Sequence, residues 1–320
     1  MKRIGIIIPV YNSGIQLAAT IDSILFQAGN YDCQILLIND FSTDETTREI
    51  LHNYINERCV TIVNNIENVG ICESRNIGLK LLAPSTDFVM FVDHDDVLAP
   101  LAFQNLMGAF NDDPNITAVM GSAYKFGPLV TSKENESFIE SQRKRRSISF
   151  HNGRFDVSYI TDNLLTYPAI LSSYTFHPPA KAMIRSDALL SSGVIFEKRF
   201  ELVEDWIFWI KLLKYGNIHT INELTAGYYW HQSNNSQRTD QIVKLKYAWR
   251  YLFWYSLQSR IYFFSYLKTT GANKNESYKF YNSLPNKTFL VYLRYWYNSV
   301  ITFLIRAMIQ LGEPAHSVND

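Results

Sequence analysis

The sequence predicts an α/β fold in which helices cover both faces of a mostly parallel β-sheet. Four short runs rich in β-branched apolar residues alternate with three helix-length segments, whose apolar residues recur every three or four positions. The runs cover residues 4–10, 34–38, 59–63 and 88–92, and the helical segments cover residues 17–26, 43–55 and 72–82. Strands that are apolar on both faces belong in a parallel sheet that helices cover on both sides.

Polar side chains follow all four predicted strands. They are Tyr11 and Asn12 after the first, Asn39 and Asp40 after the second, Asn64, Asn65 and Asn68 after the third, and Asp93, Asp95 and Asp96 after the fourth. Ligands of parallel sheets bind beyond the carboxyl ends of the strands. Any one of these segments could be a capped turn, but the four together favour a binding site.

The acidic cluster Asp93, Asp95 and Asp96 follows the fourth run directly. Crowded carboxylates repel one another, and a divalent cation or a tightly held polar ligand offsets that repulsion. A solvated turn explains the cluster equally well when it is considered alone, because D-x-D patterns arise often by chance.

Two later segments contain further candidate residues. Glu204 and Asp205 open an amphipathic helix beside Trp206 and Trp209, where they either cap the helix or provide a poorly hydrated general base. His231 lies among small polar residues, a setting typical of a surface histidine.

The irregular stretch 121–180 contains the basic run 143–146, predicted to lie in an exposed, mobile loop rather than in a phosphate-contacting flap. A strand is expected at residues 180–185.

Composition excludes several classes of protein. The 320 residues have a formal net charge of zero, which argues against general nucleic-acid binding. The three cysteines lack metal-ligand spacing and fit a reducing compartment. Pro9, Tyr11 and Asn12 interrupt the first apolar run too early for a signal peptide, so a cytoplasmic protein is expected. Neither a G-x-G-x-x-G nor a P-loop motif is present.

Five segments in order resemble motifs of the inverting, GT-A-fold nucleotide-sugar glycosyltransferases of family two, from Met1 to about Arg238. They are residues 7–12 (the opening strand), 38–44 (V-D-D-G-S-T-D in the family), 68–78 (N-x-G-x-x-x-x-R-N-x-G), 93–95 (D-x-D) and 204–205 (E-D before F-W). Asn39 and Phe41 depart from the family pattern, in place of an aspartate and a glycine. The resemblance implies a GT-A domain over residues 1–238.

The resemblance also implies a role for each site residue. The nucleotide-sugar-binding residues would be Pro9, Tyr11, Asn12, Asp40, Arg75 and Asp93. Asp40 would accept a hydrogen bond from the uracil, Arg75 would contact the uracil or the diphosphate, and Asp93 would hold the ribose. Asp95 and His231 would bind Mn²⁺ or Mg²⁺, which stabilises the leaving diphosphate. Asp205 would deprotonate the acceptor hydroxyl, and Glu204 would orient the groups around it.

Residues 239–320 lie beyond the resemblance and are predicted to form an aromatic-rich helical extension. Residues 241–320 include 19 of the 46 aromatic residues, with ten basic and three acidic side chains. Aromatic and basic residues together suit a membrane interface, whereas Arg294 and Arg306 argue against a membrane-spanning segment at 290–311. Packing on the core as a helical subdomain is an equally good interpretation.

The predicted function is metal-dependent transfer of a sugar from a UDP-sugar to a glycan acceptor. By analogy, the acceptor is linked to polyprenyl diphosphate at the cytoplasmic face of the inner membrane, in bacterial O-antigen or capsule synthesis. A sugar-phosphate nucleotidyltransferase is the second hypothesis, but the chain lacks the glycine- and basic-rich triphosphate loop. The third is a catalytically silent module that binds a sugar nucleotide or a glycan, against which Asp205 and the D-x-D argue.

Overall fold

The computed structural model describes residues 2–143, 145–151, 154–160, 164–165, 178–232 and 234. The predicted extension at residues 239–320, its boundary at 238 and its expected contact with a membrane lie outside the described residues. None of the helices within the described residues combines the length and the apolar character needed to cross a bilayer.

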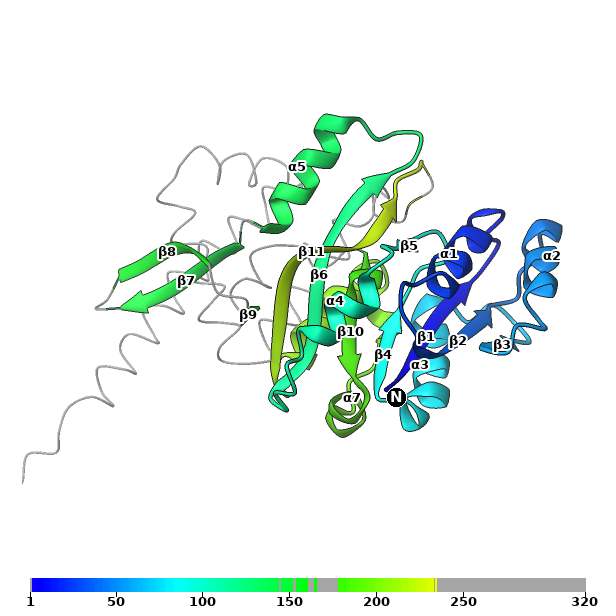
Figure 1. The fold of residues 1–320 in the computed structure, drawn as a ribbon, viewed down its shortest axis with the longest axis horizontal. Coiled ribbons are helices and arrows are strands. Elements are labelled where there is room, and N and C mark those ends of the chain that lie inside the picture. Colours follow the sequence, from blue (N-terminus) through cyan, green and yellow to red (C-terminus); the bar gives the residue numbers. More distant parts are fainter. Residues whose placement is uncertain are drawn as a thin grey trace, which may run out of the picture. The chain divides into compact units, whose positions relative to one another are not determined.

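A nine-stranded mixed sheet forms the centre of the fold (Figure 1). Its strand order is β3-β2-β1-β4-β10-β6-β11-β5, and β9 pairs with β11 off this path. The strands are β1 (Arg3–Val10), β2 (Asp32–Asn39), β3 (Val60–Asn64), β4 (Phe88–Phe91), β5 (Val97–Leu98), β6 (Ile116–Phe126), β9 (Leu164–Leu165), β10 (Ala182–Arg185) and β11 (Asn217–Tyr229). The predicted α/β class is confirmed.

The first four strands form the parallel half of the sheet that the sequence predicts. β1 pairs in parallel with both β2 and β4, and β2 pairs with β3. β10 then runs antiparallel to β4 and β6, while β6 and β11 are parallel to each other. The strand expected at residues 180–185 is therefore present, preceded by a short 3₁₀ turn at Pro179–Lys181.

Helices join the strands and cover the sheet. They are α1 (Gln16–Leu25), α2 (Glu45–Asn53), α3 (Ile71–Leu82), α4 (Ala102–Gly108), α5 (Ser132–Arg143), α7 (Ser186–Ser192) and α8 (Glu204–Leu212). The capping residue of α2 is Asp44, whose Oδ2 accepts a hydrogen bond from the backbone N–H of Thr47 at 2.8 Å. An aspartate at this position satisfies a backbone donor that the helix leaves free.

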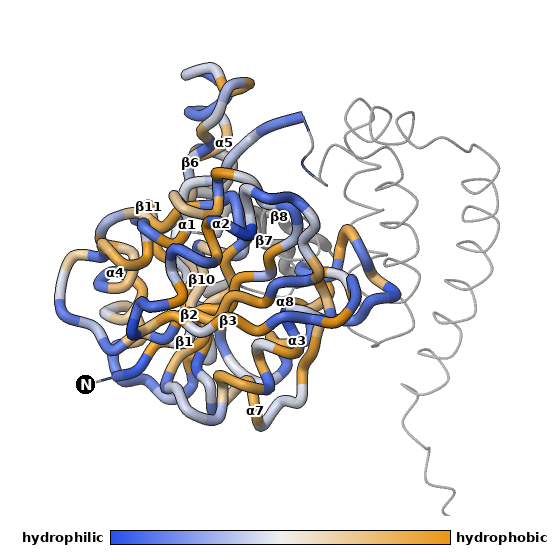
Figure 2. The backbone as a smooth tube through the Cα atoms, turned by 90° about the vertical axis from the view of Figure 1, so that its right-hand side faces the viewer, coloured by the Kyte–Doolittle hydropathy of each residue, from blue (hydrophilic) through white to orange (hydrophobic). Residues whose placement is uncertain are grey.

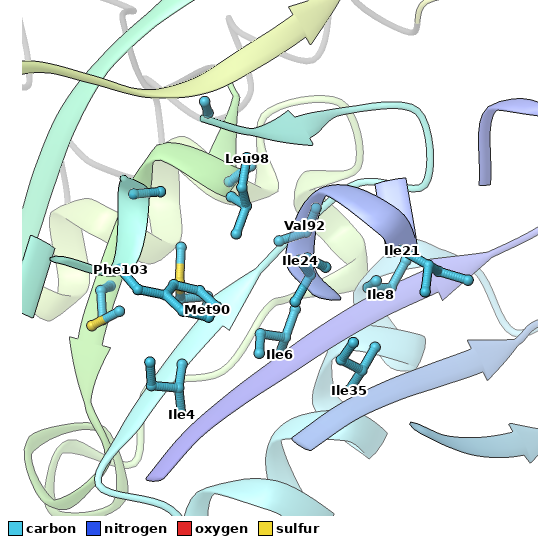
Figure 3. Packing of buried hydrophobic residues seen from close by; sticks show 14 of the residues in the cluster. Ile4, Ile6, Ile8, Ile21, Ile24, Ile35, Met90, Val92, Leu98 and Phe103 are labelled. Carbon is cyan, nitrogen blue, oxygen red and sulfur yellow. The ribbon is translucent and has the colours of Figure 1, made fainter. Parts of the chain in front are cut away.

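Alternate residues of β1 face two separate cores, which explains why the strand is apolar throughout. Ile4, Ile6 and Ile8 pack with residues of α1, α2 and α4, as Figure 3 shows for part of this cluster. Ile7 faces the other side, where residues of α3, α7 and α8 pack. Figure 2 shows β1, β2 and β3 as predominantly apolar stretches of the backbone. The sheet is thus covered on both faces, as a parallel sheet requires.

The basic run does not lie in a loop as expected. Residues up to 143 end α5, and Arg145 and Arg146 begin β7 (Arg145–His151), which forms an antiparallel hairpin with β8 (Arg154–Ile160). The cause is visible in the sequence, because residues 147–150 alternate serine with an apolar residue and alternation of this kind is typical of a strand. The preceding basic run led to the prediction of a loop instead.

Gly78 allows α3 to lie directly against β1. A Cβ atom added at position 78 would overlap the Ile7 side chain, which is fully buried. We expect Gly78→Ala to lower the free energy of unfolding by about 1–3 kcal/mol, the usual cost of overpacking a core. Urea denaturation measures this, with Gly108→Ala as the control, because a Cβ at 108 meets nothing within 4 Å. A Gly78→Ala variant as stable as the wild type would contradict this interpretation of the packing.

Candidate active site

Asp40 follows β2 and binds the loop that connects β3 with α3. One carboxylate oxygen of Asp40 accepts hydrogen bonds from the Asn65 side-chain amide and the Val69 backbone N–H, each at 2.8 Å. The other oxygen accepts from the Gly70 backbone N–H at 2.8 Å. The buried Asp40 side chain therefore fixes the loop before α3. Its implied contact with a uracil stays a prediction.

Asn12 joins the ends of β1 and β2. Its backbone N–H donates to Ser42 Oγ at 3.2 Å, and its side-chain oxygen accepts from the Thr43 backbone N–H at 2.8 Å. Tyr11 is exposed beside it, whereas Pro9 is buried within β1. The structure thus brings Tyr11, Asn12 and Asp40 to one corner of the sheet, as the strand-end pattern predicts.

Arg75 connects the acidic loop after β4 with the start of α8. Its Nη2 donates to Asp93 at 2.6 Å, its Nη1 donates to Glu204 at 3.1 Å, and its guanidinium lies 5.0 Å from the centre of the Phe196 ring. The Arg75 side chain is only 2% exposed. Burial opposes its charge, but the two carboxylates outweigh burial and hold the pKa of Arg75 above its ordinary value.

This network gives Arg75 a structural role that the sequence does not reveal. Its guanidinium orients Asp93 and Glu204, which lie 18 and 129 residues away along the chain. Phe196, which packs on the guanidinium, has no sequence signal that could have found it. The implied direct contacts of Arg75 and Asp93 with a nucleotide stay predictions.

Asp95 and His231 form the second polar pair of the acidic loop. His231 Nε2 lies 2.9 Å from an Asp95 carboxylate oxygen, and the imidazole stacks on the Tyr229 ring with centroids 5.0 Å apart. The His231 backbone N–H donates to the Asn234 side-chain oxygen at 2.6 Å. The structure therefore brings together two residues that the sequence separates by 136 positions.

Asp96 attaches the acidic loop to the end of β11. Its fully buried carboxylate accepts a hydrogen bond from the Tyr229 backbone N–H at 3.2 Å. Burial raises the pKa of Asp96 well above its ordinary value, and the neighbouring Asp95 and Asp93 raise it further. Asp96 positions the segment that presents His231, a role the sequence analysis did not assign to it.

Glu204 and Asp205 occupy the first turn of α8, and both are buried. Asp205 Oδ1 accepts from the Trp206 backbone N–H at 2.7 Å. Burial raises the pKa of Glu204 to about 7, the Asp205 charge adds to the rise, and Arg75 opposes it. The poorly hydrated setting expected for these carboxylates is therefore present, whereas the residue that precedes α8 is Val203 and no side chain caps the helix.

The donor atoms around Asp95 suit a metal only in part. Among the described residues, no group of three or more His, Cys, Asp and Glu side chains lies close enough to hold an ion. Asp95 and His231 supply one carboxylate and one imidazole. Mg²⁺ in proteins is commonly bound through one or two carboxylates together with substrate phosphates and waters. The pair therefore fits an ion that a phosphate-bearing substrate helps to bind.

Comparison with known proteins decides which family has this arrangement. The family model described as "Glycosyl transferase family 2" matches residues 5–186, more than half of the chain. The chain belongs to glycosyl transferase family 2. The match covers β1 to the start of α7 and thus the Asp40 corner, Arg75 and the acidic loop. The family named from the sequence motifs is confirmed.

Two curated relatives of this family 2 chain are named for teichoic acid biosynthesis and for transfer to poly(ribitol-phosphate). The chain is 27% identical over 247 residues to the minor teichoic acid biosynthesis protein GgaA of Bacillus subtilis, covering 75% of this chain and 48% of that protein. It is 26% identical over 219 residues to the poly(ribitol-phosphate) β-N-acetylglucosaminyltransferase TarP of Staphylococcus aureus, covering 67% of this chain and 58% of TarP. The chain thus spans about half the length of these two relatives.

The fold also resembles that of a solved structure, S. aureus TarS. S. aureus TarS residues 1–349, solved in complex with UDP-GlcNAc, superposes with a TM-score of 0.60 at 20% identity. The similarity covers 82% of this chain and 69% of that one. The structural similarity shows that the family 2 chain has the GT-A fold.

The raised pKa of Glu204 predicts a pH effect on the stability of this family 2 glycosyltransferase. Between its ordinary pKa of 4.5 and about 7, the folded protein keeps a proton on Glu204 that the unfolded chain releases. The free energy of unfolding therefore decreases as the pH rises through this window. We expect Glu204→Gln to flatten the decline of the melting temperature between pH 4.5 and 7, whereas the exposed Glu223→Gln leaves it unchanged. Parallel curves for wild type and Glu204→Gln would refute the assignment.

Proposed function

We propose that this family 2 protein is an inverting glycosyltransferase that moves a sugar from a UDP-sugar to a hydroxyl group of a surface-polymer acceptor. The observation that carries the proposal is the chain of contacts from Asp93 through Arg75 to Glu204, next to Asp205. It connects the loop expected to hold the donor with the helix start expected to activate the acceptor. The TarS complex with UDP-GlcNAc supports the donor class.

In the proposed reaction, an Asp205 carboxylate oxygen accepts the proton of the acceptor hydroxyl. The hydroxyl oxygen attacks the anomeric carbon from the side opposite the diphosphate, a new C–O bond forms, and the bond to UDP breaks with its electron pair. The configuration is thereby inverted. The first turn of α8 is buried, which keeps Asp205 out of bulk water. Arg75 holds Glu204 and Asp93 in place.

We further propose that Asp95 and His231 hold a divalent cation, Mn²⁺ or Mg²⁺. Bound there, such an ion would offset charge on the departing diphosphate. A nitrogen ligand is compatible with Mn²⁺. Tyr11, Asn12 and Asp40 would enclose the base at the neighbouring corner.

The acceptor is proposed from the relatives rather than from the site. GgaA and TarP are named for teichoic acid synthesis and for poly(ribitol phosphate), respectively, so a cell-wall polymer is the better supported acceptor class. The O-antigen and capsule acceptors expected from the sequence remain proposals, as does a polyprenyl diphosphate carrier. Attachment to a membrane surface is a proposal that depends on residues 239–320.

Measurement of released UDP tests the proposed function. The full-length protein is incubated with single UDP-sugars, with Mn²⁺ or Mg²⁺ or with a chelator, and with teichoic acid or lipid-linked glycan acceptors. We expect one donor to give acceptor-dependent UDP release that the chelator abolishes. Saturable binding of a UDP-sugar with no release under any condition would instead establish the binding-module hypothesis.

A further inference from the structure

Phe41 has a backbone conformation that bulky residues rarely adopt. Its φ angle is 67°, in the left-handed region that glycine enters freely and other residues enter at a cost. Among the residues that the structure describes, four other non-glycine residues have positive φ, and three of them are asparagine or aspartate, which tolerate this region. The remaining one, Leu202, is only 7% exposed and gains core packing in return. Phe41 is 51% exposed and gains little burial.

Hydrogen bonds on both sides of Phe41 hold this conformation. The Asp40 backbone N–H donates to the Val10 carbonyl at 2.8 Å, and the Asp40 carboxylate is fixed by the loop before α3. The Ser42 backbone N–H donates to the Asn39 side-chain oxygen at 3.1 Å, and Thr43 is bound to Asn12. Strained residues persist only where their surroundings over-determine them, and they cluster at functional sites.

The backbone of Phe41 lies at the corner of the sheet formed by Tyr11, Asn12 and Asp40. β1 and β2 are parallel with Val10 paired to Asn39, so the segment Tyr11–Asn12 continues beside Asp40–Phe41. Neighbouring strands lie about 4.8 Å apart, which is within reach of aromatic side chains.

Resting on the proposed function, we propose that the Phe41 ring stacks on the nucleobase of the donor nucleotide. Planar bases stack on aromatic side chains with a useful gain in affinity, whatever the base edge presents. A single exposed aromatic residue is by itself unremarkable, as Phe26 illustrates with 78% exposure. Phe26 has an ordinary φ of −93°, however, whereas Phe41 keeps its ring at the cost of backbone strain. Phe41 is thus a determinant of donor binding.

Paired measurements of binding and stability on the full-length protein test this proposal. Phe41→Gly removes the ring and the strain together, and Phe41→Tyr keeps both. Phe26→Gly is the matched control, because Phe26 is an exposed phenylalanine at the end of α1 with an ordinary backbone conformation. Calorimetry gives the dissociation constants of UDP and of inorganic diphosphate, and thermal unfolding gives the melting temperature.

We expect Phe41→Gly to weaken UDP binding by about tenfold, within the range that base stacking on an aromatic side chain provides. Its binding of inorganic diphosphate and its melting temperature should not fall, because glycine relieves the strained backbone. Phe41→Tyr and Phe26→Gly should bind UDP like the wild type.

Four outcomes would overturn the proposal. UDP affinity of Phe41→Gly within twofold of the wild type would refute stacking while leaving the proposed function intact. An equal loss of UDP and diphosphate affinity, or a melting temperature lowered by several degrees, would make Phe41 a residue that supports the fold. Failure of the wild type to bind UDP at all would refute the proposed function, and the stacking proposal with it.

Discussion

The Asp205→Asn variant is expected to bind UDP normally and to transfer sugar about 10² to 10⁴ times more slowly than the wild type. An amide cannot accept the proton of the acceptor hydroxyl, and a positioned general base contributes about this factor. Asparagine keeps the side-chain oxygen that accepts from the Trp206 N–H, so α8 should retain its start. Steady-state release of UDP and calorimetric UDP binding measure the two effects separately.

Asp187→Asn is a close control for this experiment. Asp187 lies in the first turn of α7, and its Oδ1 accepts from the next backbone N–H at 2.7 Å, the same geometry as Asp205. Unlike Asp205, it is exposed. Its replacement should leave turnover unchanged. Turnover of Asp205→Asn within a few-fold of the wild type would remove the catalytic assignment.

The Asp95→Ala variant is expected to lose at least about a hundredfold in metal-supported transfer. Changing even an outer-shell partner of a metal ligand commonly costs 10–100-fold, so removal of a ligand should cost no less. UDP affinity in this variant should also stop responding to Mn²⁺. In Asp40→Ala, by contrast, UDP binding should weaken equally with and without metal, because Asp40 fixes the loop before α3 and its proposed contact is with the base rather than the diphosphate.

Calorimetry with UDP, in Mn²⁺ and in chelator, distinguishes these two variants. Asp32→Ala is the control, since this carboxylate begins β2 at the other end of the strand and pairs with Arg3 on the surface. The assignment of Asp95 fails if Mn²⁺ strengthens UDP binding to Asp95→Ala as much as it does for the wild type.

The parallel half of the fold could be predicted because its information is local. Each strand there is a continuous apolar run, each helix has its own periodicity, and the polar residues that follow the strands come together by geometry alone. The arrangement of the strands beyond β4 could not be predicted in this way. β10 enters antiparallel between β4 and β6, and nothing in residues 182–185 records which neighbours or direction they take. The β7–β8 hairpin was missed because charge obscured its alternation.

The candidate site could likewise be predicted only in part. The resemblance named its residues, and the structure brings Asp95 to His231 and Arg75 to both Asp93 and Glu204. Those pairings depend on side chains far apart in the sequence and have no local signal. The hydrogen bonds of Asp40 to the loop before α3 and the positive φ angle of Phe41 could not be predicted either. Both depend on loops that lie side by side only in the folded sheet.

The hydrogen bonds from the Val69 and Gly70 amides to Asp40 also fix the beginning of α3. Those amides immediately precede the helix, and Arg75 lies one turn into it. Arg75 in turn contacts Glu204 at the start of α8. The Asp40 carboxylate therefore supports the placement of the Arg75 guanidinium as well as that of its own loop.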